Sequence, residues 1–414
     1  MQYLLFEDQS FFDLWPLTFT RPTCDLRVGI DKLQEKWTRF CKQPVGCIAY
    51  AYLGNQFSRF DPTLESICFN GKFIPDANWI RDLAEACAPG TYLANEKKEI
   101  LVFRCKPAQI GNFDGIVNEA ILTNAGLKSI TATVNERPAI RFPWDIFRLN
   151  GQCIREDFEA VIANQSSYQP EDKHSIVYGR DNLFLAAGVK MRAAVINAED
   201  GPVYIGEGVD IQEGSLIHGT HAFCDHATLN MGVKLRGDTT VGPWSKVGGE
   251  IANSVIQGYS NKGHDGYMGN SVLGYWCNLG ADTNTSNLKN NYTEVRVWNY
   301  PQERFARTGT IFCGLIMGDH SKCGINTMFN TGTVVGVSAN IFGDGYPRNF
   351  IPSFSWGGAA GLTTFTLPKA FEVAEAVMGR RKLQLEEGEK AILTEVFRRT
   401  EKYRNWEREV KSEK

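Results

Sequence analysis

Bulky apolar residues recur at every sixth position through the middle of the chain. The longest run consists of Ile205, Ile211, Ile217, Phe223, Leu229, Leu235, Val241 and Val247. The position four residues further on is usually small, as at Ser215, Ala227 and Thr239. The same spacing returns over residues 267–279, starting at Tyr267, and over residues 317–341, and Gly or Asn often follows the bulky position.

This hexad predicts a triangular parallel β-solenoid. In such a fold the large side chain fills the middle of the prism, the small one fits the crowded corner, and Gly or Asn tolerates the turn. Three hexads make one coil, so Ile205, Phe223 and Val241 are expected to stack in one internal column. Antiparallel strands also repeat at every sixth residue, but they require bulky residues at the intermediate positions, where Glu207 and Asp225 stand instead.

The pattern has three exceptions. His221 is a large polar residue in a small slot, and we interpret it as a corner residue turned outward. The frame breaks between Val247 and Tyr267 and between residues 279 and 317, which predicts two excursions from the coil. Insertions into repeat arrays tend to lie on the binding face. After the repeats, residues 368–382 and 386–408 show helical spacing.

The first part of the chain has a different pattern. Residues 3–6 are a candidate first strand, and no glycine occurs before Gly29. We therefore expect an α/β domain over 1–185, the solenoid over 186–360 and a helical extension over 361–414.

Composition narrows the function classes. The 414 residues carry a formal net charge of −3, which argues against nucleic-acid or membrane-surface partners. The chain has no apolar run of about 18 residues, and its N-terminus has no basic segment ahead of an apolar stretch. Its 11 cysteines form no Cys-x-x-Cys pair, which is typical of reduced, packed thiols. We expect a cytoplasmic protein with no membrane partner.

Candidate chemistry gathers where the repeat is disturbed. His264 lies in Gly-His-Asp-Gly, with Tyr267 three residues later and Asn278 about one coil further on. We expect Tyr267 and Asn278 to point to the same face. A neutral imidazole near pH 7 suits a general base that takes a proton from an amine or hydroxyl. The alternatives are a solvated corner histidine at 264 and a base at His320, itself more typical of a corner residue.

His-x-x-Tyr, an Asn fourteen residues after the His, and then Leu-Gly-Ala resemble the acyltransferase segment of hexapeptide-repeat proteins. The chain resembles the bifunctional sugar-1-phosphate nucleotidylyltransferase/acetyltransferase family. This resemblance implies a left-handed β-helix in a homotrimer. It also implies acetyl-CoA bound between neighbouring helices near Ala281 and Thr327. His264 would be the base that deprotonates an amino-sugar phosphate, a small-molecule substrate contacted by Arg236, Tyr267 and Asn278.

Three positions depart from the family pattern. Ala252 stands where the family has a phosphate-binding lysine, the family's Asn-Tyr pair reads Asn287-Leu288, and a late serine reads Ile325. Lys262 or Lys289 could supply the lost positive charge, although each is by default a surface lysine. Asn287 remains a candidate substrate ligand.

The segment from Pro16 to Pro22 resembles the nucleotidyltransferase signature of the same family, without its glycine-rich loop and without its lysine. Arg21 and Arg27 could grip a phosphate or could hold the loop to the domain. The resemblance implies possible use of UTP and Mg²⁺, but no Gly-Asp pair follows the apolar strand at 100–103, and we expect no resident metal site. Two interpretations follow: an acetyltransferase with a diverged nucleotidyltransferase domain, or a non-catalytic sugar-nucleotide-binding or trimeric scaffold protein.

Overall fold

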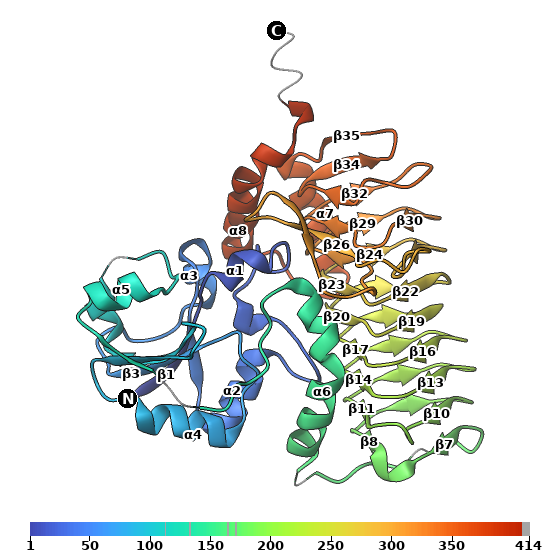
Figure 1. The fold of residues 1–414 in the computed structure, drawn as a ribbon. Coiled ribbons are helices and arrows are strands. Elements are labelled where there is room, and N and C mark those ends of the chain that lie inside the picture. Colours follow the sequence, from blue (N-terminus) through green and yellow to red (C-terminus); the bar gives the residue numbers. More distant parts are fainter. Residues whose placement is uncertain (112, 132–133, 164, 170–171, 408–414) are drawn as a thin grey trace. The chain divides into compact units, whose positions relative to one another are not determined.

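A computed structural model of the protein describes residues 1–111, 113–131, 134–163, 165–169 and 172–407 (Figure 1). Contacts group the chain into two compact units. The first, here the α/β unit, contains residues 1–14, 20–26 and 31–142, and the second, here the β-helix unit, contains residues 15–19, 27–30 and 143–414. Among the described helices, none is long and apolar enough to cross a lipid bilayer.

The α/β unit is built on one six-stranded sheet in the order β2-β1-β3-β5-β4-β6. Its strands are β1 (Gln2–Phe6), β2 (Val45–Ile48), β3 (Ser66–Asn70), β4 (Thr91–Ala94), β5 (Ile100–Cys105) and β6 (Lys128–Thr131). Neighbours β1–β2, β1–β3 and β4–β6 are parallel, whereas β5 is antiparallel to both β3 and β4. The expected first strand at residues 3–6 is β1.

Short helices cover this sheet: α1 (Ser10–Asp13), α2 (Leu33–Cys41), α3 (Gly54–Phe57), α4 (Ala77–Ala86), α5 (Glu119–Asn124) and the 3-10 turns η1 (Thr23–Asp25), η2 (Ala51–Leu53) and η3 (Pro107–Ile110). Asp76 caps α4 by accepting a hydrogen bond from the Trp79 amide at 2.9 Å. Directly after β1, where a glycine-rich loop would bind phosphate, the chain instead forms α1.

The second unit is a parallel β-helix whose coils run through three sheets, here faces 1, 2 and 3. Face 1 contains β7 (Ile176–Tyr178), β10 (Val195–Asn197), β13 (Leu216–His218), β16 (Lys234–Arg236), β19 (Glu250–Ala252), β22 (Tyr267–Gly269), β25 (Asn284–Thr285) and β30 (Met328–Phe329). Face 2 contains β8 (Leu183–Leu185), β11 (Val203–Ile205), β14 (His221–Phe223), β17 (Thr239–Val241), β20 (Val255–Gly258), β23 (Val272–Tyr275), β28 (Ile316–Met317), β31 (Val334–Val335) and β33 (Phe350–Ile351).

Face 3 contains β9 (Lys190–Met191), β12 (Asp210–Ile211), β15 (Thr228–Leu229), β18 (Lys246–Val247), β21 (Asn261–Lys262), β24 (Asn278–Leu279), β29 (Lys322–Cys323), β32 (Asn340–Ile341), β34 (Ser355–Gly358) and β35 (Gly361–Thr364). The strands of each face are parallel except the final pair, β34 and β35, which is antiparallel. The described chain therefore closes this edge with a reversed strand.

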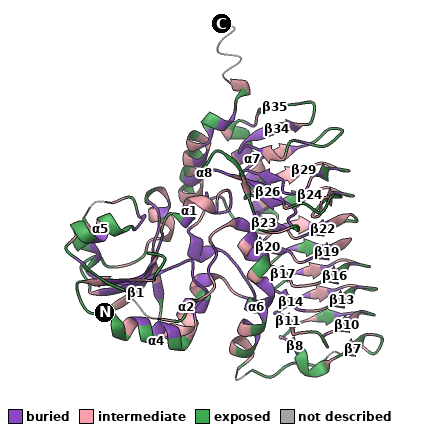
Figure 2. Ribbon diagram, in the orientation of Figure 1, coloured by how far each residue is buried: buried purple, intermediate pink, exposed green. Residues whose placement is uncertain are grey.

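The predicted internal column is confirmed. Ile205 pairs with Phe223, and Phe223 pairs with Val241, in successive coils of face 2, and all three side chains are buried. The small slots are buried too, as at Ser215 and Thr239. Buried residues recur along the strands of the β-helix (Figure 2). The predicted fold class, an α/β domain followed by a parallel β-helix and then helices, is confirmed.

The predicted excursion between residues 247 and 267 is wrong, because this segment forms a regular coil with shortened corners. β19, β20 and β21 pair in register with the strands on either side. Met268, rather than Tyr267, is the inward residue of β22, and Tyr267 is only partly buried. The second excursion leaves the coil after β25 and contains an antiparallel hairpin, β26 (Arg296–Asn299) and β27 (Arg304–Arg307).

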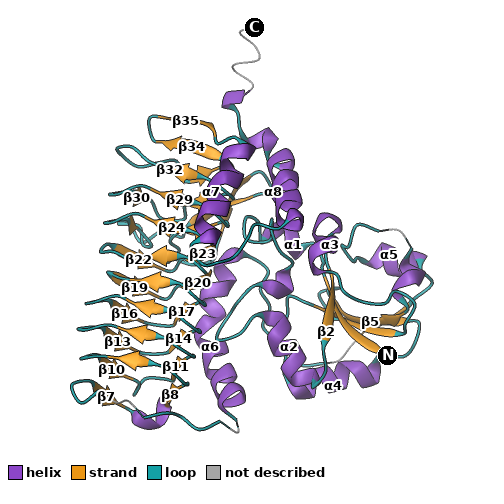
Figure 3. Cartoon of the chain, turned by 180° about the vertical axis from the view of Figure 1, so that it is seen from behind, coloured by secondary structure: helices purple, strands orange, loops and turns teal. Residues whose placement is uncertain are grey.

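Helices and loops cover the outside of face 2 (Figure 3). The long helix α6 (Pro143–Ile162) runs along it, and the segment at residues 27–30 inserts beside that helix. The Gly29 amide donates to Asn150 Oδ1 at 2.8 Å, and the Thr240 hydroxyl of β17 donates to the Gly29 carbonyl at 3.0 Å. A Cβ at residue 29 would lie 2.4 Å from a carboxylate oxygen of Asp157, so this close approach requires glycine.

The helical tail consists of α7 (Leu367–Gly379), α8 (Glu387–Arg399) and the turn η5 (Glu401–Tyr403). It packs against the β-helix through Phe397, whose ring lies 4.9 Å from that of Phe354, and through Arg381, which lies over the Trp244 ring. Trp244 belongs to a series of rings at the corner between faces 2 and 3. Its neighbours there include His226 at 4.3 Å.

His221 is fully buried, so the prediction that it turns outward is wrong. It pairs with Val203 and Thr239 in face 2, and this register places its ring inside the corner. Its Nε2 lies 3.1 Å from the His218 carbonyl oxygen. Burial lowers the pKa of His221 to about 4.

The buried imidazole predicts a specific acid sensitivity. Between pH 6.5 and about 4 the unfolded chain takes up a proton at His221 and the folded chain does not, so stability falls as the pH is lowered. The loss from this group amounts to roughly 1–3 kcal/mol. His221→Gln removes the titrating ring, and its urea midpoint should change less between pH 6.5 and 4.5 than that of the wild type. His226→Gln, at an exposed ring, is the control and should keep the wild-type pH dependence.

Candidate functional site

One turn between face 3 and face 1 is shortened. Four residues connect β15 to β16, whereas only Gly248 and Gly249 connect β18 to β19. A Cβ on Gly248 would lie 2.4 Å from the carbonyl oxygen of Gly263, and Gly249 has a φ of +70°. The glycine pair thus permits a turn too short for other residues, and the longer turns of the neighbouring coils border a hollow beside it.

His264 lies on this hollow, together with Asp265, Ala281 and Asp282 from the coils that follow. The His264 side chain is exposed, in the turn that leads from face 3 into β22. An exposed imidazole beside a concave surface can accept a proton from a bound molecule, which fits a general base.

The backbone of this turn is held from two sides. Asn230 Nδ2 donates to the Gly263 carbonyl at 2.7 Å, reaching across the shortened coil. From inside the β-helix, Lys262 Nζ donates to the carbonyl oxygens of His264 at 2.5 Å and Asp265 at 2.8 Å. The turn is therefore fixed while the imidazole remains accessible.

The two expectations for Lys262, a substrate contact or an ordinary surface lysine, both require an outward side chain, and that placement is wrong. It pairs with Val247 in face 3 and continues the inward column, so its side chain is fully buried. Burial lowers its pKa to about 8, against the opposing effect of the Asp265 carboxylate.

Outside face 1, five polar side chains lie together, three from adjacent strands and two from the segments that follow β22 and β25. Arg236 of β16 forms an ion pair with Glu250 of β19, with Nη2 and Oε1 2.6 Å apart. Asn287 Nδ2 donates to the Tyr267 hydroxyl at 3.1 Å and to Asn270 Oδ1 at 2.8 Å. Burial raises the pKa of Tyr267, and the positive charge of Arg236 opposes that effect. Arg236, Tyr267 and Asn287 thus form one polar cluster, and His264 lies in the turn that leads into it.

The expectation that Tyr267 and Asn278 share a face is wrong. Tyr267 begins β22 in face 1, whereas Asn278 begins β24 in face 3, where its Oδ1 accepts a hydrogen bond from Asn261 Nδ2 at 3.3 Å. Within a single chain, the side-chain amide that contacts Tyr267 is that of Asn287. His320 lies at a different corner, between faces 2 and 3, where its ring stacks 6.4 Å from that of Trp276.

The remaining predicted ligands are divided between the surface and the interior. Ala281 borders the hollow. Thr327, predicted to contact acetyl-CoA, lies in a small inward slot, 4% exposed, with its hydroxyl donating to the Gly324 carbonyl at 2.9 Å. Lys289 Nζ donates to the Glu294 carbonyl at 2.9 Å within the long loop. Thr327 therefore offers no outward contact.

The two N-terminal arginines make contacts within the protein. Arg21 forms an ion pair with Asp25, and the Arg27 guanidinium donates to the carbonyl of Ile30. The Arg27 backbone amide donates to Gln257 Oε1 at 2.7 Å. These contacts are the ones expected of arginines that hold the loop in place.

At the end of the sheet in the α/β unit, carboxylates are already paired with cations. Lys72 Nζ lies 2.7 Å from Asp8 and 2.9 Å from Glu99, and Arg141 pairs with Glu99 at 2.8 Å. Mg²⁺ prefers oxygen ligands in an octahedral arrangement with several waters. Since these carboxylates are neutralised by protein cations, the described residues fit Mg²⁺ poorly.

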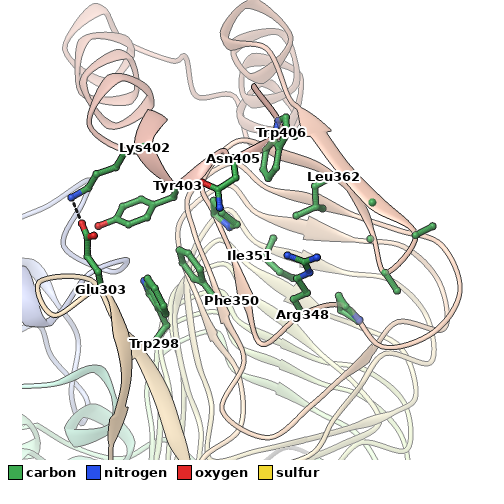
Figure 4. A pocket seen from close by; sticks show the side chains of 16 residues that line it. Trp298, Glu303, Arg348, Phe350, Ile351, Leu362, Lys402, Tyr403, Asn405 and Trp406 are labelled. Atoms are coloured by element: carbon green, nitrogen blue, oxygen red, sulfur yellow. Dashed lines mark hydrogen bonds and ion pairs between the residues drawn. The ribbon is translucent and has the colours of Figure 1, made fainter. Parts of the chain in front are cut away.

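A second hollow lies near the end of the β-helix unit (Figure 4). Trp298 stacks on Phe350 there at 4.3 Å, and Lys402 forms an ion pair with Glu303. Among the described residues that line it, none is a histidine or a cysteine. This hollow carries no chemistry comparable to that at His264.

Three residues of the site were missed from the sequence. Glu250 and Asn270 belong to the polar cluster, and Asn230 fixes the His264 turn from the coil two turns earlier. Asn230 reaches residue 263 only because the corner between them is shortened, and the six-residue repeat does not predict this contact. Glu250 follows the Gly-Gly pair directly, and that pair was the available signal.

The inward ammonium predicts a stability that depends on pH. Between pH 8 and 10 the unfolded chain keeps a proton on Lys262 that the folded chain releases, so stability from this group rises with pH. The rise is at most about 1.4 kcal/mol per pH unit. Relative to Lys262→Met, the wild-type urea midpoint should increase over this range. Lys246→Met, at the outward position of the preceding coil, should show the same pH dependence of the urea midpoint as the wild type. An equal pH dependence in all three proteins would place the Lys262 ammonium outside the core.

The first 166 residues resemble one known family, since residues 3–166 match the family model described as sugar nucleotidyl transferase. The chain is 31% identical over 153 residues to a bifunctional sugar-1-phosphate nucleotidylyltransferase/acetyltransferase of Sulfurisphaera tokodaii, covering 35% of this chain and 38% of that protein. It is 36% identical over 87 residues to the bifunctional protein GlmU of Methanocaldococcus jannaschii, covering 21% of each chain. The matched segments thus span well under half the length of these relatives.

Two solved structures match the chain with low TM-scores. The polySia-specific acetyltransferase NeuO matches with a TM-score of 0.27 and 14% identity, covering 48% of this chain and 87% of that one. The Arabidopsis UDP-N-acetylglucosamine acyltransferase matches with a TM-score of 0.22 and 16% identity, covering 56% and 90%. The resemblance to bifunctional nucleotidylyltransferase/acetyltransferases therefore rests on the sequence matches, and it is confirmed by them.

Proposed function

We propose that the β-helix unit transfers an acetyl group from acetyl-CoA to the amine of an amino-sugar 1-phosphate. The observation that carries this proposal is the position of an exposed histidine, on a rigid turn, beside an outward polar cluster. The hollow at the shortened corner gives a bound molecule access to that histidine. The names of the sequence relatives, which include acetyltransferase activity, support the same reaction class.

His264 acts as the general base. Its imidazole accepts a proton from the sugar amine as the amine nitrogen attacks the acetyl carbonyl of the thioester. The carbon–sulfur bond then breaks, and coenzyme A leaves as the free thiol with the proton that the imidazole returns. The two carbonyl hydrogen bonds from Lys262 and the bond from Asn230 keep the turn in place during this step. A base on a fixed backbone loses little conformational freedom when the substrate binds.

The polar cluster binds the sugar phosphate. Arg236 offers a planar guanidinium that suits a phosphate, and its side chain is 63% exposed although it pairs with Glu250. Tyr267 and Asn287 offer a hydroxyl and an amide for sugar hydroxyl groups. Because Glu250 competes for Arg236, phosphate binding requires the guanidinium to exchange one anionic partner for another.

Acetyl-CoA supplies the activated acyl group, and Ala281, on the hollow, would border it. The open hollow gives only one wall of a binding site, so we propose a homotrimer in which a neighbouring β-helix completes it. Asn278 would then face a neighbour from face 3. The alternative is a sugar-nucleotide-binding or scaffold protein without catalysis, which the His264 experiment distinguishes.

For the α/β unit we propose a diverged nucleotidyltransferase fold with weak or absent uridylyl transfer. The match over residues 3–166 supports the fold. The helix α1 replaces a flexible glycine loop whose amide groups would wrap a triphosphate.

His264→Ala should lower acetyl transfer by roughly 10²–10⁴-fold, the usual contribution of a positioned proton acceptor. The exposed turn should accept alanine with a stability change within about 0.5 kcal/mol. The measurement is free-thiol release from acetyl-CoA with glucosamine 1-phosphate, together with urea unfolding of the same protein.

His320→Ala is the matched control, because this histidine lies at another corner, in a later coil of the same β-helix. It should retain most of the activity. Full activity of both variants would reduce His264 to a solvated corner residue, whereas a wild-type protein without acetyl transfer would favour the binding or scaffold alternative.

The second prediction concerns UTP. The α/β unit should release no pyrophosphate from UTP and a sugar 1-phosphate at rates typical of enzymes, about 1–1000 per second. A coupled pyrophosphate assay with Mg²⁺ checks this. Turnover within that range would show that α1 and its neighbours form a working phosphate site.

A further inference from the structure

Three side chains of the α/β unit converge just beyond the end of β1. Glu7 directly follows that strand, Cys47 lies in the neighbouring strand β2, and Cys24 lies in η1. One carboxylate oxygen and the two sulfur atoms all lie within 4.8 Å of one another. The exposed fractions are 2% for Glu7, 1% for Cys24 and 2% for Cys47. Among the described residues, no other set of three acidic, cysteine or histidine donors is this compact.

The surrounding fold fixes these positions. The parallel pairing of β1 with β2 aligns Leu5 with Cys47, so Glu7 emerges two residues beyond the thiol. The Thr23 amide donates to Glu7 Oε1 at 2.7 Å, which brings η1 and its Cys24 over the end of the strand. The arrangement does not depend on flexible surface side chains.

The donor set suits a particular class of ion. Thiolates are soft ligands and bind Zn²⁺ with S–Zn distances near 2.3 Å, so tetrahedral ligands lie roughly 3–4 Å apart, within the observed limit. Mg²⁺ and Ca²⁺ prefer oxygen ligands and are disfavoured by two sulfur atoms. We propose that Glu7, Cys24 and Cys47 form a buried Zn²⁺ site that ties the η1 segment to the sheet.

Charge and protons balance at such a site. Binding releases the protons of both thiols, and that of Glu7 where it is protonated, and three anionic ligands with Zn²⁺ leave a net charge of −1. The residue after Cys24, Asp25, pairs with both Arg21 and Lys32, which offset its negative charge.

The site is closed to solvent, so the ion would enter while the chain folds. In such sites metal binding contributes to folding free energy. A fourth tetrahedral position remains for a further ligand, and the Thr23 hydroxyl, which also interacts with the Glu7 carboxylate, is a neighbouring oxygen. The site is separate from the proposed acetyl-transfer residues, and its existence does not depend on that function.

The test uses the full-length protein without a histidine tag, made in zinc-supplemented medium under reducing conditions. We expect one zinc per chain by elemental analysis. Refolding with Co²⁺ should give the thiolate-to-cobalt charge-transfer band and the visible bands of tetrahedral cobalt. Cys24→Ser and Cys47→Ser should lose the stoichiometric metal and weaken the charge-transfer band. Cys41→Ser, at a partly buried cysteine of the same unit, is the control and should retain both.

A serine variant that fails to fold leaves Glu7→Gln as the second probe, because it keeps both thiols and changes only the oxygen ligand. Its bound zinc should be removed by a chelator at a concentration that the wild type resists. Wild-type protein without stoichiometric zinc and without the cobalt spectrum would overturn the proposal. Serine variants with unchanged metal content would also overturn it. The same holds if the mass of the wild-type chain shows a Cys24–Cys47 disulfide, two hydrogens lighter, under these conditions.

Discussion

The pairing of each coil with the next is the constraint on which the β-helix unit depends. Parallel strands lie about 4.8 Å apart, so every residue is placed by the residue one coil away. A coil that loses residues at a corner cannot relax along its strands. It must draw its turn inward, as Gly248 and Gly249 do, and the adjacent turns then span the gap. The accessibility of His264 and the reach of Asn230 both follow from this single shortened turn.

The same register decides which side chains are inside, whatever their polarity. Lys262 and His221 both occupy interior positions that most coils fill with apolar or small residues. Each is accommodated near a corner, where backbone carbonyls face the side chain and accept its hydrogen bonds. The interior is therefore tolerant of polar groups at its corners, provided that the chain supplies these acceptors.

The regular part of the fold could be predicted because a six-residue period leaves little freedom. Ile205, Phe223 and Val241 stack as the period requires. The candidate site could not be predicted to the same depth, because corners vary by one or two residues and each change turns the following side chains. Tyr267 is displaced from the inward slot in this way. Asn278 falls on another face, and loop residues such as Asn287 follow no period at all.

The rings at the corner between faces 2 and 3 limit how this chain can vary. Trp244, Tyr259 and Trp276 have φ values of +59°, +54° and +62°, a conformation that costs a non-glycine residue roughly 1–2 kcal/mol. Stacking of neighbouring rings, such as the pair of Tyr259 and Trp276 at 4.4 Å, returns about 0.5–1.5 kcal/mol. The series begins with His226. The residue at the same corner one coil earlier is Gly208, and a Cβ there would lie 2.5 Å from the His226 ring. An aromatic residue here is tolerable beside another ring and unfavourable alone. Rings at this corner should therefore be gained and lost from the ends of the series during evolution, rather than one at a time from its middle.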